Sequence, residues 1–154
     1  MTIGGNERQY SIANGLKLLP DDAEIILVHD AARPLISRQT INDVIDAAEK
    51  FGGAIAAVPS KDTIKIIDDE GFVKYTPPRR ELVVVQTPQG FHREILLRAY
   101  DKAAEEKFLG TDDASLVEKL GARIKIVAGG YENIKIMTPE DINVAETFLR
   151  GEIK

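Results

Sequence analysis

Two residues that could do chemistry, Asp30 and Arg33, follow a short apolar run at 25–28. The run is typical of a buried strand, and ligands of open α/β sheets bind at the carboxyl ends of the strands. Asp30 offers hard oxygen ligands for Mg²⁺, and Arg33 offers a planar fork for phosphate or sugar oxygens. Taken alone, the stretch is better explained as an Asp–Arg pair in a surface turn, so a metal-binding hypothesis depends on the rest of the chain.

Further polar residues fall at the ends of other predicted strands or in a predicted hairpin. Thr87, Thr111 and Lys135 belong to the first group, and Thr63 and Arg79 belong to the second. With the acid and the arginine above, they supply one carboxylate, several hydroxyls and three cations, which suits an anionic, hydroxylated substrate with a divalent metal. A nucleophilic triad cannot be assembled from this set. A solvated strand lysine is the simpler reading of Lys135.

Composition narrows the class of protein. The 154 residues fit one domain, and 44% hydrophobic residues can supply a core. A net charge of -5 does not suggest a binder of nucleic acid or membrane surfaces. The absence of cysteine excludes disulfides and thiolate catalysis, and no signal peptide or membrane-length apolar segment is visible. We therefore expect a cytoplasmic protein, although a plastid protein without its transit peptide would look the same.

Alternating strands and helices position these residues and predict an α/β fold. The strands are expected at 24–28, 54–58, 82–85, 123–127 and 133–137, and the helices at 9–19, 38–51, 91–107, 111–120 and 138–150. The strand–helix–strand unit at 24–58 predicts parallel strands. The sheet should therefore be mostly parallel and flanked by helices.

Local signals mark the ends of several elements. Ser37 is a good N-cap for the helix at 38–51, and Thr111 and Thr138 are expected to cap the later helices. Asp112 and Asp113 then lie in a first helical turn, where acids are favourable without any chemistry. The polar residues at 86–90 are expected to form a strand end where a ligand could sit.

The stretch at about 59–86 interrupts the α/β rhythm. It predicts a β-hairpin arm, with strands at 62–67 and 72–75 and a turn at 68–71. A lone hairpin is marginal in water, so the arm must pack against something else. The partner is either the same arm of a second copy or the chain's own sheet, and the residues leave both open.

Several motifs in order along the chain carry a resemblance to a known family. They are Gly4-Gly5-Asn6-Glu7-Arg8-Gln9 with Ser11, Val28-His29-Asp30-Ala31-Ala32-Arg33-Pro34, Lys61-Asp62-Thr63-Ile64-Lys65, Gln86-Thr87-Pro88-Gln89-Gly90-Phe91, Thr111-Asp112-Asp113-Ala114, Asn133-Ile134-Lys135-Ile136 and Thr138-Pro139-Glu140-Asp141. Any one of these motifs is weak, but together they are specific. The chain closely resembles the bacterial and plastid 2-C-methyl-D-erythritol 4-phosphate cytidylyltransferases, which belong to the nucleotidyltransferase superfamily.

The resemblance implies a Rossmann-like sheet and a reaction. The reaction transfers a cytidylyl group from CTP to methylerythritol phosphate and releases pyrophosphate, with Mg²⁺ or another divalent cation, in non-mevalonate isoprenoid biosynthesis. It implies catalytic roles for Asp30 and Lys135, with Asp30 near the metal and the nucleotide. The implied substrate-binding residues are Arg33, Thr63, Arg79, Val85, Thr87, Thr111 and Lys135, and the other nucleotide-binding residues are Gly5, Asn6 and Ser11. In this family the arm reaches the partner subunit's site, which implies a homodimer.

One departure from the family is expected to matter. The family opens with a strand and a Gly-rich loop that bind the CTP triphosphate, and this sequence starts at Met1 just before the Gly-Gly turn. The expectation is therefore one nucleotidyltransferase-like domain at 1–154, N-terminally incomplete and weak or inactive alone, because one preorganised charge can contribute about 10²–10³ in rate. The alternatives are a pentitol (ribitol) 5-phosphate cytidylyltransferase and a non-catalytic dimeric module that binds a sugar phosphate.

Overall fold

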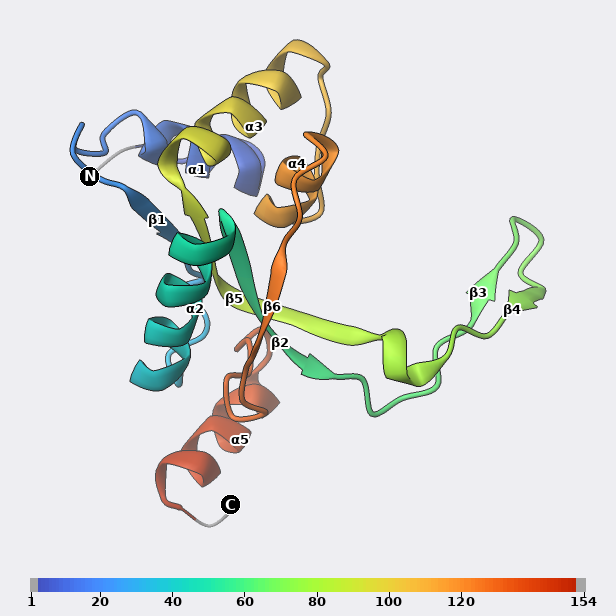
Figure 1. The fold of residues 1–154 in the computed structure, drawn as a ribbon. Coiled ribbons are helices and arrows are strands. Elements are labelled where there is room, and N and C mark those ends of the chain that lie inside the picture. Colours follow the sequence, from blue (N-terminus) through green and yellow to red (C-terminus); the bar gives the residue numbers. More distant parts are fainter. Residues whose placement is uncertain (1–2, 152–154) are drawn as a thin grey trace.

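A central four-stranded sheet organises the computed structural model, which describes residues 3–151 (Figure 1). Its strands are β1 (Ile25–Val28), β2 (Gly53–Pro59), β5 (Val83–His92) and β6 (Lys125–Ala128), in the order β1-β5-β2-β6. β2 pairs with β6 in parallel, whereas β5 pairs antiparallel with both β1 and β2. The predicted α/β class is confirmed. β1 and β2 run in the same direction, as expected, but β5 lies between them.

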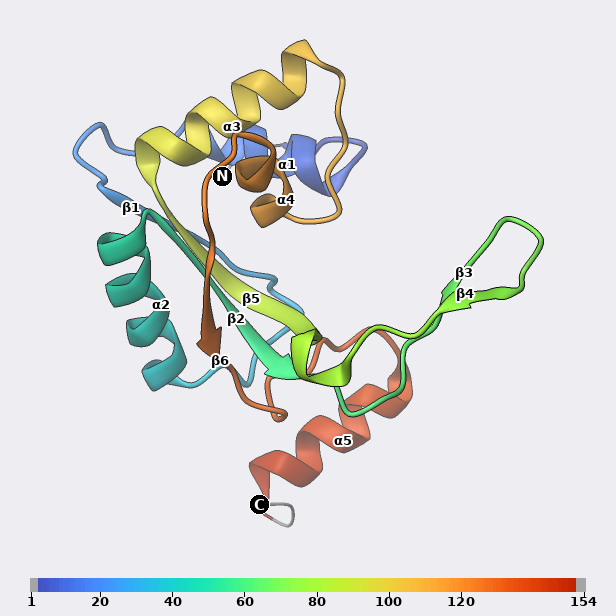
Figure 2. The same ribbon diagram turned by 45° about the vertical axis from the view of Figure 1, so that its right-hand side comes forward.

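Helices cover both faces of this sheet. They are α1 (Arg8–Leu16), α2 (Arg38–Phe51), α3 (Arg93–Glu105), α4 (Asp113–Lys119) and α5 (Pro139–Leu149). The helix α2 lies on one face, and α1, α3 and α4 lie on the other (Figures 1 and 2). The helix α5 lies apart from these layers, at the end of the sheet opposite to α3 (Figures 1 and 2).

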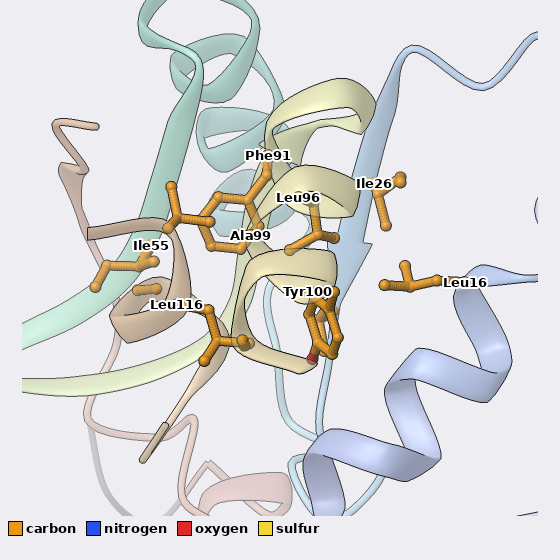
Figure 3. Packing of buried hydrophobic residues seen from close by; sticks show 12 residues of the cluster. Leu16, Ile26, Ile55, Phe91, Leu96, Ala99, Tyr100 and Leu116 are labelled. Atoms are coloured by element: carbon orange, nitrogen blue, oxygen red, sulfur yellow. The ribbon is translucent and has the colours of Figure 1, made fainter. Parts of the chain in front are cut away.

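Alternation along β2 separates the core into two layers. Ile55 joins the larger cluster with Phe91 and Leu96 under α3 and α4 (Figure 3), whereas Ala54 and Ala56 face α2. This alternation is the period of two that strand geometry imposes. The side chains of Phe91 and Leu96 are fully buried, so truncating either would cost about 2–5 kcal/mol.

The small residues opposite α2 allow that helix to approach the sheet closely. A Cβ atom at Gly90 would lie 2.9 Å from Val44 Cγ1 and 2.8 Å from Leu27 Cδ2. The helix itself spans the predicted residues, because the Ser37 side chain accepts a hydrogen bond from the Thr40 N–H at 3.0 Å. Gly52, with a φ of 87°, ends it in the left-handed region.

Two expected features of the later chain are wrong. The N-cap of α4 is Asp112 and not Thr111, because the Asp112 carboxylate accepts the Ser115 N–H in a capping box. The expected strand at 133–137 does not form. In this extended segment, the Ile136 N–H donates to the Ala32 carbonyl at 2.8 Å, which ties it to the turn after β1.

The expected strand end at 86–90 is also wrong, because β5 continues through it to His92. The strand bulges there. Ile55 pairs with Gln89 and Ala57 pairs with Val85, so four steps along β5 match two along β2. A bulge redirects side chains and frees them from the regular ladder. The bulge therefore explains how a run of polar residues fits inside a buried strand, which the alternation of residue types did not reveal.

The hairpin projects from the body of the molecule (Figures 1 and 2). Its strands, β3 (Ile66–Ile67) and β4 (Val73–Tyr75), are shorter than predicted, and the 3-10 helix η1 (Arg79–Glu81) follows them. The segments that lead into and out of the arm are joined at its base, where the Ser60 N–H donates to the Leu82 carbonyl at 3.1 Å. The arm therefore occupies 60–82, within the predicted 59–86, because Val83 already belongs to β5. The alternative that the arm folds back on its own sheet is wrong.

Within residues 3–151, no helix combines the length and the apolar character needed to cross a membrane.

Candidate functional site

Asp30 lies at the centre of a cluster of three cations at the carboxyl end of β1. Lys135 Nζ lies 3.1 Å from Asp30 Oδ2, and Arg33 Nε lies 3.8 Å from the same oxygen. Arg8 Nε donates to Asp30 Oδ1 at 3.3 Å. The structure thus brings together Asp30, Arg33 and Lys135, which the sequence had singled out, and adds Arg8. The cations outnumber the carboxylate, so this cluster suits an anionic ligand.

The electrostatics of the cluster favour an ionised Asp30. Burial alone would raise the pKa of this carboxyl, but the hydrogen bond and charge of Lys135, followed by those of Arg8, hold its pKa below the usual value. Burial lowers the pKa of Arg33, and the Asp30 charge opposes this shift. A guanidinium keeps its proton in proteins, so Arg33 stays a cation beside the ligand position.

The Thr87 hydroxyl is committed to internal hydrogen bonds. It accepts the Asp30 N–H at 2.9 Å and lies 3.0 Å from His29 Nδ1. His29 Nε2 lies 3.1 Å from the Arg33 carbonyl, which can only accept, so Nε2 carries the hydrogen. In a neutral imidazole, Nδ1 then accepts from the Thr87 hydroxyl. Thr87 is 5% exposed, and its first role is to fix the turn that presents Asp30.

Asn133 holds the same turn from the other side, and the sequence reading did not single it out as a site residue. Its buried Nδ2 donates to the Thr87 carbonyl at 2.9 Å and to Gln86 Oε1 at 3.2 Å. The backbone carbonyl of Asn133 accepts from Arg33 Nη1 at 2.7 Å. One residue therefore links the β5 bulge, through its side-chain amide, to the Arg33 guanidinium, through its backbone carbonyl. Its place at the start of the Asn133-Ile134-Lys135-Ile136 motif was the signal that could have found it.

Arg8 bridges two carboxylates, and its role was also missed. Besides Asp30, it reaches Asp113 Oδ2 with Nη2 at 2.8 Å, and the Tyr100 hydroxyl donates to Asp113 Oδ1. Asp113 lies in the first turn of α4, as expected, but it is fully buried and is held by Arg8 and Tyr100 rather than only by its place in the turn. Burial alone would lower the pKa of Arg8, but Asp113 and then Asp30 raise it. Burial also raises the pKa of the Tyr100 phenol.

A pocket of about 330 Å³ opens beside Arg33 and Lys135 and extends to the base of the arm. Lys61 and Tyr131 form part of its wall, with Lys61 Nζ 3.5 Å from the centre of the Tyr131 ring. Three basic side chains and one acidic side chain, Asp62, line it. Its charge therefore favours an anionic occupant, such as a phosphate ester.

Of the other residues expected to bind a nucleotide, Gly5 and Asn6 lie in a tight turn before α1, and Ser11 lies in the first turns of that helix. The Gly5 N–H donates to Ser11 Oγ at 2.9 Å, and the Ser11 hydroxyl reaches the Glu7 carbonyl at 3.2 Å. A Cβ at Gly5 would lie 2.4 Å from Tyr10 Cβ, so glycine is required there. Asn6 is exposed. These contacts shape the turn, and the nucleotide-binding roles stay predictions.

Four other expected site residues stand apart from Asp30. Arg79 Nη2 donates to Thr63 Oγ1 at 2.9 Å, so these two meet each other in the arm. Val85 is a half-exposed residue of β5, and Thr111 is exposed beside the N-cap of α4. Among residues 3–151, no hydrogen bond or ion pair joins these four to Asp30. Their substrate-binding roles stay predictions.

A divalent cation fits this site only together with phosphate groups. The residues from 3 to 151 include no group of three or more His, Asp or Glu side chains that could hold a metal. Mg²⁺ is often bound through one or two carboxylates plus substrate phosphates. Asp30 can supply that single carboxylate, and the surrounding cations can attract the phosphates.

The fold and the site define an α/β protein with an anion-binding cluster at the carboxyl end of a strand, where such sheets bind ligands. The sequence model of the IspD family, 2-C-methyl-D-erythritol 4-phosphate cytidylyltransferase, matches residues 1–151. The chain belongs to this family.

Relatives with curated names agree with this assignment. A 2-C-methyl-D-erythritol 4-phosphate cytidylyltransferase from Caldanaerobacter subterraneus is 52% identical over 147 residues, which make up 96% of this chain and 65% of the relative. One of the same name from Syntrophus aciditrophicus is 48% identical over 152 residues, or 99% of this chain and 65% of the relative. The chain thus spans a little under two thirds of these relatives.

Solved structures share the fold. The 4-diphosphocytidyl-2C-methyl-D-erythritol synthase from Anaerococcus prevotii superposes with a TM-score of 0.92 at 39% identity, covering 97% of this chain and 69% of that one. The 2-C-methyl-D-erythritol 4-phosphate cytidylyltransferase from Thermus thermophilus gives 0.86 at 36% identity, covering 97% and 72%. The predicted Rossmann-like class is therefore confirmed.

Proposed function

We propose that this chain takes part in cytidylyl transfer from CTP to 2-C-methyl-D-erythritol 4-phosphate, giving 4-diphosphocytidyl-2-C-methyl-D-erythritol and pyrophosphate. The observation that supports this proposal is the Asp30 carboxylate, which lies among Lys135, Arg8 and Arg33 at a strand end. The chain belongs to this family. We infer that residues 1–154 act as one nucleotidyltransferase-like unit in the cytoplasm.

The chemistry requires position and charge more than a covalent intermediate. A phosphate oxygen of the substrate forms a bond to the α-phosphorus of CTP, and the bond from that phosphorus to the bridging oxygen breaks as pyrophosphate leaves. Lys135 and Arg33 attract the substrate phosphate and hold it in line with the α-phosphorus. Such positioning and charge stabilisation account for most catalysis of phosphoryl-type transfer.

A divalent cation, Mg²⁺ in the first instance, would neutralise the CTP phosphates when it is bound. Asp30 is the residue that would hold it, and the low pKa of this carboxyl keeps a ligand charge available at neutral pH. The turn around Gly5, Asn6 and Ser11 would receive the cytidine. Thr87 and Thr111, with Val85, would line the sugar-phosphate side.

The arm supports a homodimer. It carries Phe72 and Tyr75, both exposed, with Ile67 and Val73 beside them, and exposed apolar side chains on a projecting hairpin need a partner. A second copy is the simplest one. Thr63 and Arg79, which meet each other near the base of the arm, would then reach the partner's site.

The test is release of pyrophosphate in the presence of CTP, methylerythritol phosphate and Mg²⁺. The Caldanaerobacter relative serves as the positive control, and ribitol 5-phosphate as the competing substrate. Replacing Lys135 with Met should lower the rate by about 10²–10³, whereas Lys17→Met, on the exposed end of α1, should not. If the relative turns over but this chain neither turns over nor binds CTP, the proposal fails. Substrate binding without turnover would favour the non-catalytic module, and preference for ribitol phosphate would favour the pentitol alternative.

A further inference from the structure

We propose that Arg8 is a positioning residue, held by the buried Asp113 so that it fixes the Asp30 carboxylate and joins the turn before α1 to the reacting centre. The inference rests on the proposed function for the identity of the ligand but not for the geometry. Arg8 lies at the first residue of α1, Asp30 follows β1, and Asp113 begins α4. One side chain thus connects three separate elements.

The geometry gives Arg8 two unequal partners. The Nη2 atom lies 2.8 Å from Asp113, whereas the Nε atom lies 3.3 Å from Asp30. Asp113 has no exposed surface, and the Tyr100 hydroxyl already donates to its other oxygen. Removing the cation that pairs with a buried carboxylate strongly destabilises the folded protein. Arg8 is therefore held from the Asp113 side, and its contact with Asp30 is the weaker of the two.

This inequality matters when a ligand arrives. A cation at Asp30 would repel Arg8, and an incoming phosphate would attract it. Because Asp113 retains the guanidinium, Arg8 stays beside the site in both situations and keeps its place relative to Gly5 and Ser11. The contacts of α1 reinforce this, since Gln9 Nε2 donates to the Phe108 carbonyl at 3.0 Å and the Gly110 N–H donates to Gln9 Oε1 at 3.0 Å.

Asp113→Asn is the sharpest variant, because Asp113 is buried and cannot touch a ligand. The matched control is Glu106→Gln, which removes an ion pair with Lys119 between α3 and α4, away from Asp30. The first measurement is nuclear magnetic resonance of the ligand-free chain at pH 7. The Arg8 Nε–H should give a slowly exchanging signal, and Asp113→Asn should make it exchange quickly and should shift the Asp30 carboxyl carbon signal. Glu106→Gln should change neither.

The second measurement is calorimetric binding of CTP with Mg²⁺. We expect Asp113→Asn and Arg8→Met to weaken binding about 10- to 100-fold, as loss of a residue that orients a ligating group typically does. Arg8→Lys should recover part of that loss, because it keeps the charge but not the fork.

The outcomes separate the two proposals. If Asp113→Asn lowers only the free energy of unfolding and leaves both the Asp30 signal and the affinity unchanged, Arg8 is merely structural and the inference is wrong. If even the unaltered chain fails to bind CTP, the proposed function fails, and the Arg8 inference is decided by the resonance experiment alone. A fast-exchanging Arg8 signal in the unaltered chain would overturn it.

Discussion

Replacing Thr87 with Val tests whether this hydroxyl holds the Asp30 turn. Valine matches threonine in shape but removes an oxygen that accepts the Asp30 N–H at 2.9 Å and faces His29 at 3.0 Å. Each hydrogen bond contributes about 1 kcal/mol, and an unsatisfied buried donor costs about 1–3 kcal/mol. The apolar methyl offsets part of this, so we expect a loss of about 1.5–3 kcal/mol in the free energy of unfolding.

Urea unfolding followed by circular dichroism measures this loss. The midpoint should fall while the slope stays constant, because the surface exposed on unfolding does not change. For a chain of this size, the melting temperature should fall by about 3–12 °C. Thr87→Ser removes the methyl group but keeps the hydroxyl, so it serves as the control for a change at this position that leaves the hydrogen bonds in place. If Thr87→Val loses less than about 0.5 kcal/mol and no more than Thr87→Ser, the hydroxyl does not hold the turn.

Three further predictions use the same structure. The depressed pKa of Asp30 means that its ionised form stabilises the fold above about pH 4 and that this contribution is lost as the pH falls through the lower folded-state value. Acid titration of Asp30→Asn should therefore show a flatter loss of stability as the pH falls below about 5, and an unchanged curve would contradict the assignment. Phe72→Ser should shift the sedimentation coefficient toward a monomer with little change in unfolding free energy, because Phe72 is 68% exposed, and a dimer that persists would remove the arm from the interface. Gly90→Ala should cost about 1–3 kcal/mol, since its Cβ would lie 2.9 Å from Val44, whereas Gly15→Ala, with nothing within 4 Å, should be neutral or stabilising in the same unfolding assay.

The elements with strong local signals were predictable from the sequence. The helix α2 has a capping serine, one apolar face and a terminal glycine, and its observed bounds, Arg38–Phe51, match the prediction. The Asp30–Arg33 turn was found for a similar reason, because an apolar run ended on charge. The signals for each of these features lie within fewer than twenty consecutive residues.

The remaining errors came from contacts between distant segments. The bulge in β5 is defined by the register of β2, and Pro88 and Gly90 within it indicate a strand end as readily as a bulge. The segment at 133–137 has strand-like residues, but its backbone bond to a distant segment, from the Ile136 N–H to the Ala32 carbonyl, goes to a turn rather than to a strand. Arg8 and Asp113 are 105 positions apart, and no period in the sequence relates them. Their pairing depends on α1 packing beside α4.

The long strand β5 connects the arm to the site and sets the distance between them. Val83 pairs with Pro59 at the base of the arm, and the Thr87 hydroxyl accepts the Asp30 N–H. Gln89 Oε1 accepts the Ala114 N–H at 3.0 Å. These three contacts fall within seven residues of one strand. Deleting or inserting one residue between 83 and 89 would turn the following side chains to the opposite face. The distance from arm to site is therefore set by residue count, so a change in the length of this segment disturbs the site more than a single side-chain replacement on its exposed face.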